Sequence, residues 1–381
     1  MKARDVRCHV VRHELSEPFG FSQWWYDARE LCLVEVTTDE GITGWGEGYG
    51  PARVIRAAVE HFFAPLLIGR DVEDPPAVWR ALYERSSDYG RKGIMLSAIS
   101  ALDIALWDIK AKAAGEPVWR LLSDSDDVPG RIPAYATGMY FVKRDDLPAI
   151  LAEEAAGYVE EGFGGLKMKI GLGREADVAN VDAVRERIGP EPLLMVDANH
   201  AYGADEAIAM ARRLEPYGIT WFEEPVSPDD LDGYRRVRRD APMPVAGGEC
   251  EFTRYGFGPL LREGCVDIAQ PDPCAAGGIS ELRHIAALAE ERGVPVLLHT
   301  WGSAVALAVA LHLNAGMLTG RRAPDLGFPR PWIELDRTEN PFRDRLLLQP
   351  IALERGTLSV PQGPGLGIEV DRQMVEAHEV T

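Results

Sequence analysis

Leu193-Leu-Met-Val-Asp197 is a short apolar run that ends in a carboxylate, and it is the first of three such runs. Ile219-Thr-Trp-Phe-Glu223 and Pro244-Val-Ala-Gly-Gly-Glu249 follow, and their acids stand at intervals of 26 residues (223 − 197 and 249 − 223). Apolar runs at this spacing, with helical stretches between them, are typical of consecutive βα units of a parallel sheet. The sequence therefore predicts neighbouring parallel strands that each end in an acid.

The same βα rhythm extends over most of the chain and predicts the fold class. Eight strand ends are expected, which is the number that a closed α/β barrel of the (β/α)8 type requires. They are Thr137, Lys169, Asp197, Glu223, Glu249, Asp272, His299 and Glu334. We therefore predict a catalytic barrel over residues 129–335.

The segments on either side of the barrel predict a second, smaller α+β domain. Strands are expected over residues 6–15 and 31–37, a turn at 39–41 and a helix over 94–114. The polar stretch 124–130 contains Pro and Gly and is typical of a linker. We expect a capping domain over residues 1–128, completed by the C-terminal segment 336–381.

The three acids predict a metal site. One acid after a strand is commonly a helix cap that faces water. Capping does not explain why three acids close three strands at one repeat. Because the carboxyl ends of barrel strands converge, the three side chains are expected to meet at one point. Hard oxygen ligands of this kind favour Mg²⁺, so Asp197, Glu223 and Glu249 are the predicted ligands.

Charge and composition limit the partners of the chain. The formal net charge is −19 and the sequence pI is about 4.9, which argues against binding to nucleic acid or to anionic membranes. The longest apolar stretch, residues 304–311, is too short to span a bilayer, and no apolar signal segment opens the chain. The five cysteines are odd in number and form no Cys-x-x-Cys pair. We expect free thiols, a cytoplasmic protein and a small-molecule carboxylate as the partner.

Two lysines in one predicted strand point to an anionic ligand. Lys167 and Lys169 in Gly165-Leu-Lys-Met-Lys-Ile-Gly171 project to the same side of that strand. Barrel strands are normally apolar, so two buried ammonium groups need anionic partners. We expect the two charges to lower each other's pKa, which suits Lys169 as a base near neutral pH. A structural salt bridge is the alternative role.

The far end of the predicted barrel supplies a second basic group. His299 closes the apolar run Val296-Leu-Leu-His299, and Asp272 closes the preceding run in Gln270-Pro-Asp272. Because adjacent strand ends lie side by side, we expect a hydrogen bond that fixes the imidazole tautomer and raises its basicity. Most lone histidines are structural, but this setting favours a catalytic one. His200 is a candidate for the layer around the metal ligands.

A set of short motifs runs in a fixed order along nearly the whole chain. The set comprises Ser100-Ala-Leu-Asp103-Ile-Ala-Leu-Trp-Asp108-Ile-Lys110, Lys167-x-Lys169, Asp197-x-Asn199, Glu223-Glu224-Pro225, Gly248-Glu249, Asp272 with His299, and Glu334. In this order and spacing it resembles the mandelate racemase group of the enolase superfamily. That resemblance implies a modified, (β/α)7β barrel, an α+β cap and a homo-oligomer.

The resemblance also implies roles for single residues. Lys169 and His299 would be acid–base groups on opposite faces of the substrate, with Asp272 orienting His299. Lys167 and a protonated Glu334 would stabilise the substrate carboxylate as it becomes an enediolate. Asn199 would hold a hydroxyl or carboxylate oxygen, and Mg²⁺ would sit on the three acids.

Within this group the framework segments are similar to acid-sugar enzymes. Tyr135-Ala-Thr-Gly138, Arg254-Tyr-Gly256 and Gly363-Pro-Gly-Leu-Gly-Ile-Glu369 resemble the galactarolactone cycloisomerase family. The implied reaction is β-elimination from a sugar acid or its lactone after α-proton removal; a dehydratase would expel water. Racemisation or epimerisation of a 2-hydroxy acid is the alternative. The expected substrate contacts from the cap are Trp24, Tyr26 and Arg91.

Four other functional classes are less consistent with these residues. A Schiff-base aldolase on the same barrel would use Lys167 or Lys169, but it leaves the three acids unexplained. The motif Gly171-Leu-Gly-Arg-Glu-Ala176 matches a dinucleotide-binding fingerprint, although the strand before it carries lysines. A non-catalytic barrel would not need every catalytic position to be filled. An amidohydrolase would need a His-x-His on the first strand, where Tyr135-Ala-Thr137 stands.

Overall fold

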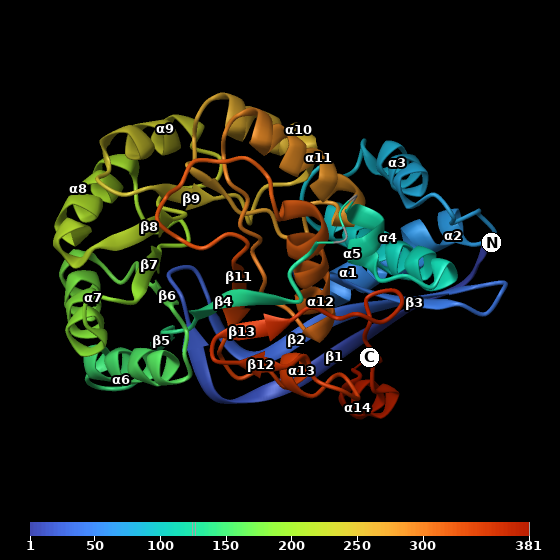
Figure 1. Ribbon diagram of the computed structural model, residues 1–381, viewed down its shortest axis with the longest axis horizontal. Coiled ribbons are helices and arrows are strands. Elements are labelled where there is room, and N and C mark those ends of the chain that lie inside the picture. Colours follow the sequence, from blue (N-terminus) through green and yellow to red (C-terminus); the bar gives the residue numbers. More distant parts are fainter. Residues whose placement is uncertain (124, 126, 381) are drawn as a thin grey trace.

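A computed structural model describes residues 1–123, 125 and 127–380. The chain forms a barrel and an antiparallel sheet with its own helices, which lie side by side (Figure 1). Asp124 and Asp126, which belong to the predicted linker, lie outside the described residues. No helix within the described part of the chain has the length and apolar character needed to cross a membrane.

An antiparallel sheet forms the first module. Its strands are β1 (Ala3–Gly20), β2 (Trp25–Thr38) and β3 (Thr43–Gly48), and β5 (Phe141–Val142) joins β1 at the edge. The two strands expected here are confirmed but extend further at both ends. The turn expected at residues 39–41 is also confirmed, because Gly41 takes a φ of 84° that a glycine adopts without strain.

Helices cover one face of this sheet. They are α1 (Ala52–Ala58), α2 (Ala64–Leu67), α3 (Pro75–Ser86), α4 (Ile94–Ala114) and α5 (Val118–Leu122), with a π-helical turn over Val59–Phe63. The helix expected over residues 94–114 is confirmed as α4. It is almost wholly buried, because β3 meets it through glycines that let the two backbones approach closely.

The barrel follows the (β/α)7β order. Its named strands are β4 (Arg131–Thr137), β6 (Gly165–Lys169), β7 (Leu193–Asp197), β8 (Ile219–Glu223), β9 (Val245–Gly247), β10 (Ile268–Ala269) and β11 (Ile333–Asp336). Val296 supplies the remaining position through a parallel bridge to Ala269, and β11 pairs in parallel with β4. The intervening helices are α6 (Leu147–Glu160), α7 (Arg174–Ile188), α8 (Ala204–Leu214), α9 (Leu231–Asp240), α10 (Thr253–Arg262), α11 (Gly278–Glu291) and α12 (Ala304–Leu313).

Three of the predicted strand ends lie beyond the strands themselves, and one of them, His299, stands three residues after the bridge at Val296. β9 ends at Gly247, two residues before Glu249, and β10 ends at Ala269, three residues before Asp272. Gly248 has a φ of 125° and turns the chain at this point. A Cβ there would lie 2.9 Å from the Phe257 ring, so the turn needs a glycine for both conformation and space. The acids therefore stand on loops held at the barrel rim.

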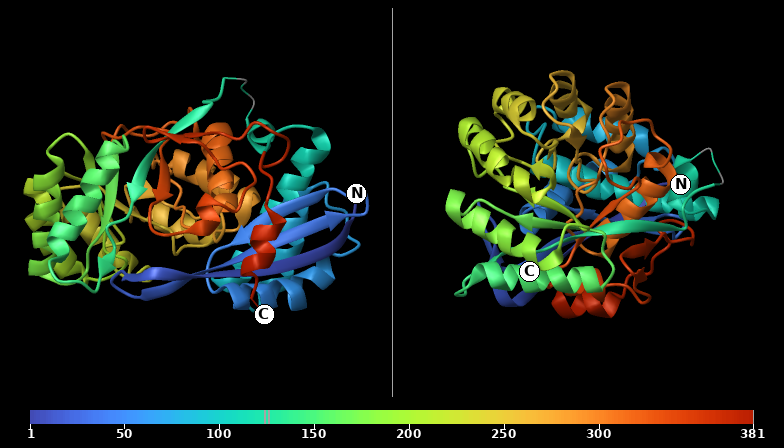
Figure 2. Two further views of the ribbon diagram at one scale, coloured as in Figure 1. Left: turned by 90° about the horizontal axis from the view of Figure 1, so that it is seen from below. Right: turned by 60° about the vertical axis from the view of Figure 1, so that its left-hand side comes forward.

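The tip of the β1–β2 hairpin crosses one end of the barrel (Figure 2). The Ser22 hydroxyl donates to the carbonyls of Ala198 at 2.7 Å and Asn199 at 3.0 Å. These carbonyls lie just after β7, so the tip covers the carboxyl ends of the strands. In (β/α) barrels this is the end that carries active sites.

The C-terminal segment touches both modules. It contains α13 (Pro341–Asp344), β12 (Leu353–Glu354), β13 (Thr357–Ser359) and α14 (Arg372–His378). Two short turns lie earlier in the chain, a 3-10 turn over Glu215–Tyr217 and a π-helical turn over Asn314–Leu318. β13 pairs with β4 of the barrel, whereas the Val380 N–H donates to the Val10 carbonyl of β1 at 2.8 Å. This segment ties the sheet to the barrel.

Gly46→Ala is expected to destabilise the protein. The new Cβ would lie 1.9 Å from the Ala101 carbonyl oxygen of α4, so β3 and α4 would have to separate. We expect the free energy of unfolding to fall by about 1–3 kcal/mol, as for overpacking in other cores. Urea denaturation measures this change. Gly157→Ala in α6, where a Cβ meets nothing within 4 Å, is the control. Equal loss in both variants would contradict the role given to the close approach.

Candidate active site

Three carboxylates converge at the barrel end that the hairpin covers. Asp197, Glu223 and Glu249 each offer an oxygen, and these oxygens lie within 4.8 Å of one another. All three residues are buried. Burial raises the pKa of Glu223 to about 7, with the charge of Lys167 opposing and the nearby acids adding to the rise. Hard oxygen donors gathered in this way, with mutual repulsion, fit a divalent cation of the Mg²⁺ kind.

Neighbouring side chains fix the orientation of these acids. Glu223 accepts hydrogen bonds from Trp221 Nε1 at 2.9 Å and from Gln270 Nε2 at 2.6 Å. Asp197 accepts from the Asn199 N–H at 2.9 Å. No sequence pattern singles out Trp221 or Gln270, although Gln270 directly precedes the Pro-Asp pair at the end of the β10 segment.

Both lysines of β6 point into this group of acids. Lys169 Nζ lies 2.5 Å from Asp197 Oδ2, and Lys167 Nζ lies 2.7 Å from Glu334 Oε1 and also contacts Glu223. Burial lowers the pKa of Lys169, but the charge of Asp197, together with Tyr140 and Glu249, raises the pKa above its usual value. The pKa of Lys167 is likewise raised by Glu223 and Glu334 against the effect of burial. Lys167 does lower the pKa of Lys169, as expected, but the acids outweigh this effect, so the expectation of lowered values overall is wrong.

The surroundings of Glu334 favour an ionised carboxylate over the protonated acid that was expected. Burial raises the pKa of Glu334, but the charges of Lys167 and His299 lower it to about 2. Thr137 Oγ1 donates to it at 2.6 Å and the Thr300 N–H donates at 3.0 Å. Because its described partners are all donors, an ionised Glu334 satisfies them best.

The hydrogen bond expected between Asp272 and His299 is confirmed. Asp272 Oδ2 lies 2.6 Å from His299 Nδ1, and the second ring nitrogen lies 3.5 Å from Glu249 Oε2. Burial lowers the pKa of His299, but Glu249 and the bond from Asp272 outweigh burial and raise it to about 10. Among the three acids, His299 therefore contacts Glu249, whereas Lys169 contacts Asp197.

Two residues of the cap that contact the His299 loop were not predicted from the sequence. Glu47 of β3 is buried and accepts from the Ser303 N–H at 3.0 Å and from the Ser303 hydroxyl at 2.5 Å. Burial raises the pKa of Glu47 to about 7. The Tyr49 ring lies edge-on to His299, with 5.4 Å between centroids. The only signal was an acid among the glycines of Gly44-Trp-Gly-Glu47-Gly48.

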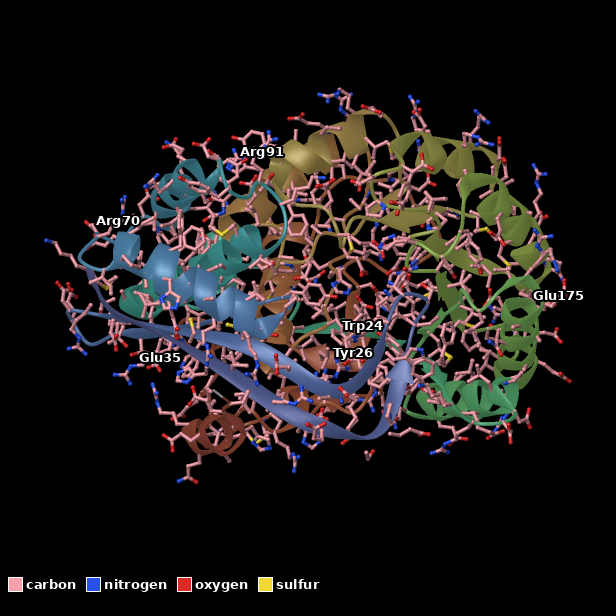
Figure 3. The ribbon with its side chains drawn as sticks, turned by 180° about the vertical axis from the view of Figure 1, so that it is seen from behind. Trp24, Tyr26, Glu35, Arg70, Arg91 and Glu175 are labelled. Atoms are coloured by element: carbon pink, nitrogen blue, oxygen red, sulfur yellow. The ribbon has the colours of Figure 1, made fainter. Side chains whose placement is uncertain are left out.

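The predicted cap contacts do not all reach one place. The Tyr26 ring lies 5.0 Å from that of Trp301, beside the His299 loop, whereas Trp24 is 64% exposed on the hairpin tip. Figure 3 shows Trp24 and Tyr26 together and Arg91 well apart from them. Arg91 lines a separate groove with Tyr83 and Tyr255. The structure thus brings Tyr26 towards the acids, but not Arg91.

Asn199 lies in the second layer of the site. Its amide nitrogen donates to Glu224 Oε2 at 3.3 Å, while its buried Oδ1 has no hydrogen-bond partner among the described residues. An unpaired buried acceptor next to the acids is available to a substrate hydroxyl. His200, expected near the metal ligands, lies 3.1 Å from Glu224.

The glycine-rich loop after β6 has no free donors for a dinucleotide. The N–H groups of Gly171, Leu172 and Gly173 all donate to the carboxylate of Asp177, at 2.9 to 3.0 Å. A pyrophosphate would need these same N–H groups at the start of the following helix. The dinucleotide-binding alternative therefore fails at the loop that suggested it.

The sequence of the chain is similar to known protein families and to curated proteins. The family described as "Enolase C-terminal domain-like" matches residues 150–374, and the family "Mandelate racemase / muconate lactonizing enzyme, N-terminal domain" matches residues 3–123. D-galactarolactone cycloisomerase of Agrobacterium fabrum is 44% identical, over 98% of this chain and 97% of its own length. Arabinonate dehydratase of Saccharolobus solfataricus is 36% identical, over 92% and 91%.

Solved structures agree over the full length. The 3,6-anhydro-D-galactonate cycloisomerase of Zobellia galactanivorans is 45% identical, with a TM-score of 0.89 and 100% coverage of both chains. A racemase of Streptomyces coelicolor solved with bound magnesium is 30% identical, with a TM-score of 0.87 and coverage of 99% and 100%. The curated relatives are thus acid-sugar cycloisomerases and dehydratases. The chain is an enzyme of the mandelate racemase/muconate lactonizing enzyme family in the enolase superfamily.

Proposed function

We propose that this enzyme removes the proton α to the carboxylate of a sugar acid or its lactone and then eliminates the β-substituent. The observation that carries the proposal is the approach of two basic groups to one set of acids. Lys169 meets the set at Asp197, and His299 meets it at Glu249. A substrate carboxylate held at the acids would have its α-carbon between these two groups, which could then act on opposite faces.

Asp197, Glu223 and Glu249 would hold one Mg²⁺. When bound, this ion supplies positive charge to the oxygens of the substrate carboxylate as the α-proton leaves. The fit rests on three buried carboxylates with oxygens within 4.8 Å of one another. Their excess negative charge is what the ion would neutralise, and the pairing of Lys169 with Asp197 would weaken in its presence.

The remaining polar residues would divide the work of binding. Lys167, held between Glu223 and Glu334, would face the carboxylate that becomes an enediolate. An ionised Glu334 acts on the substrate through Lys167, whose ammonium group it holds in place. The unpaired Oδ1 of Asn199 would accept from a substrate hydroxyl.

The cap would select the substrate. We propose the division into a cap, residues 1–128 with 336–381, and a barrel, residues 129–335. Tyr26 is placed to line the substrate cavity beside Trp301. Trp24 and Arg91 would take part only if the hairpin tip and the Tyr83–Tyr255 groove draw closer on binding.

Elimination and racemisation share the first step, so the two-base arrangement also supports a racemase or epimerase. The names of the relatives, which are cycloisomerases and dehydratases, favour elimination. A Schiff-base aldolase gains no support. A nucleophilic lysine needs a lowered pKa, whereas Asp197 raises the pKa of Lys169 above its usual value against the effect of burial.

We also propose a cytoplasmic homo-oligomer. All five cysteines are free, as expected for a protein kept in a reducing compartment. Analytical ultracentrifugation of the purified protein reports the assembly state directly.

Turnover is expected to depend strictly on Mg²⁺. D-galactarolactone and arabinonate, the compounds named for the relatives, are the first substrates to test, with lactone loss and 2-keto acid formation as the two signals. Dialysis against EDTA should abolish both signals and Mg²⁺ should restore them. Glu249→Gln should prevent restoration while the protein stays folded, because removal of one acid relieves repulsion among the three. Full turnover after EDTA dialysis would refute the metal site.

Each of the two basic groups is expected to be essential. Lys169→Ala and His299→Asn should each lower kcat at least about 10²-fold, the lower end for general acid–base catalysis. Proton exchange at the α-carbon in D₂O should survive in only one of the two variants, and that result identifies the abstracting base. Lys110→Ala, a change in α4 away from the acids, is the control. Exchange and turnover that stay intact in both site variants would exclude the two-base mechanism.

Asp272→Asn is expected to change the pH dependence of stability in metal-free protein. Folding raises the pKa of His299 from its ordinary value of 6.5 to about 10, so protonated His299 stabilises the fold fully below pH 6.5. This contribution is lost as the pH rises towards 10. Without the carboxylate the folded pKa falls, so the variant should be less stable at pH 6 and should lose less stability between pH 7 and 10.

Urea unfolding in EDTA at several pH values measures this slope. Asp205→Asn, a change at an exposed surface acid that pairs with Arg236, is the matched control. A slope equal to that of the unchanged protein in Asp272→Asn would show that Asp272 does not hold the imidazolium. Turnover with Mg²⁺ should fall in the same variant, because the imidazole loses its orienting group.

A further inference from the structure

A second group of possible metal ligands lies behind the three acids. His200, Glu224 and Cys250 each offer one ligand atom, and these atoms lie within 4.8 Å of one another. The same three chain segments that supply Asp197, Glu223 and Glu249 supply this group. The two sets therefore stand on the same three chain segments but use different side chains as ligands.

The ring of His200 turns one nitrogen towards the other two donors of this group. Its Nδ1 lies 3.2 Å from the Val226 carbonyl, an acceptor, so Nδ1 carries a proton. Its Nε2 lies 3.1 Å from Glu224 Oε2. In a neutral ring with this tautomer, the lone pair of Nε2 would face a carboxylate oxygen. The ring nitrogen and the Glu224 oxygen are thus both directed at the space between them, as two ligands of one ion would be.

The third donor meets the same ring nitrogen. Cys250 Sγ lies 3.5 Å from His200 Nε2. A nucleophilic Cys–His–Glu triad would need the carboxylate on the opposite nitrogen, Nδ1, to orient the ring. Here the carboxylate and the sulfur both approach Nε2. The arrangement is therefore wrong for a nucleophile and right for three ligands that surround one ion.

The spacing fits a small tetrahedral ion. With bonds of about 2.0–2.3 Å, ligand atoms of a tetrahedral zinc site lie about 3.3–3.8 Å apart. The separations of 3.1 Å and 3.5 Å in the present group are close to this range. The His200 side chain is 18% exposed, so an ion can enter from solvent.

The backbone also holds these side chains in an unusual way. Asn199, His200 and Glu224 have φ values of 42°, 68° and 44°, in the left-handed region that non-glycine residues rarely adopt. Such conformations are strained for residues that carry a Cβ. Two of the three proposed ligands are thus kept in strained conformations that turn them towards one point.

We propose that His200, Glu224 and Cys250 form a second cation site, with the nitrogen, oxygen and sulfur donors that zinc prefers. Binding replaces a proton: the thiol proton of Cys250 leaves to solvent, and the ion takes its place. A water molecule completes the tetrahedron. Magnesium binds sulfur ligands poorly, so the two sites would select different ions.

Cobalt titration tests the site, because Co²⁺ replaces zinc and gives a near-ultraviolet charge-transfer band only when a thiolate binds it. The full-length protein is titrated in excess Mg²⁺, which occupies the three-carboxylate site. We expect the band to reach its maximum at one equivalent of Co²⁺ per protein and to disappear when zinc displaces the cobalt. Cys250→Ser should abolish the band, and Cys265→Ser, a change at a buried cysteine whose thiol contacts the Leu231 carbonyl, should keep it. Glu249→Gln should also keep it, because that acid belongs only to the magnesium site.

A second variant guards against misfolding. His200→Gln keeps the thiol and should weaken cobalt binding at least about tenfold; its fold is checked by circular dichroism without metal. The proposal is overturned if the unchanged protein gives no band, which would leave only the direct contact between His200 and Glu224. It is also overturned if the band survives Cys250→Ser or disappears in Cys265→Ser.

Discussion

Burial of excess negative charge at one end of the barrel is the constraint on which the rest of the structure depends. Six carboxylates are buried there: Asp197, Glu223, Glu224, Glu249, Asp272 and Glu334. Their buried cations are Lys167, Lys169 and an imidazolium at His299. A buried carboxylate without a partner is costly, so the acids are tied to neighbouring donors, and their grouped oxygens fit a divalent cation. The two lysines act as counterions to these acids, which explains their raised pKa values.

The cap is joined to this site by more than coverage. Glu47 of the sheet binds the first turn of α12, which directly follows the loop of His299. Arg29 of β2 pairs with Asp336 of β11 at 2.5 Å and lies over the Trp301 ring at 3.8 Å. These contacts link cap strands to two neighbouring strand ends. Movement of the cap would therefore shift the loop that carries His299. Lys169 on β6 would be held in place by its contact with Asp197.

The sequence was informative wherever a property depends on periodicity. The interval of 26 residues placed Asp197 and Glu223 at strand ends, and the apolar pattern gave α4 its bounds. It was less informative where the third dimension decides. Glu249 follows its strand because a turn at Gly248 intervenes, Asp272 stands three residues beyond β10, and an apolar run does not show where pairing stops. The pKa values of Lys169 and Glu334 depend on charges from other strands, which neighbours in sequence do not reveal. Glu47 and Tyr49 contact residues across the boundary between cap and barrel, and an acid among glycines in the sequence does not show which distant segment it meets.

The docking of the hairpin tip has an evolutionary consequence. Ser22 binds the carbonyls of Ala198 and Asn199, which are main-chain atoms. Every residue type offers such a carbonyl, so this anchor survives substitution on the barrel side. The tip itself can then change its side chains on either side of Ser22 without losing its seat above the strands. A lineage could in this way exchange one sugar acid for another by drift in a short segment, while the acids and bases that perform the chemistry stay unaltered.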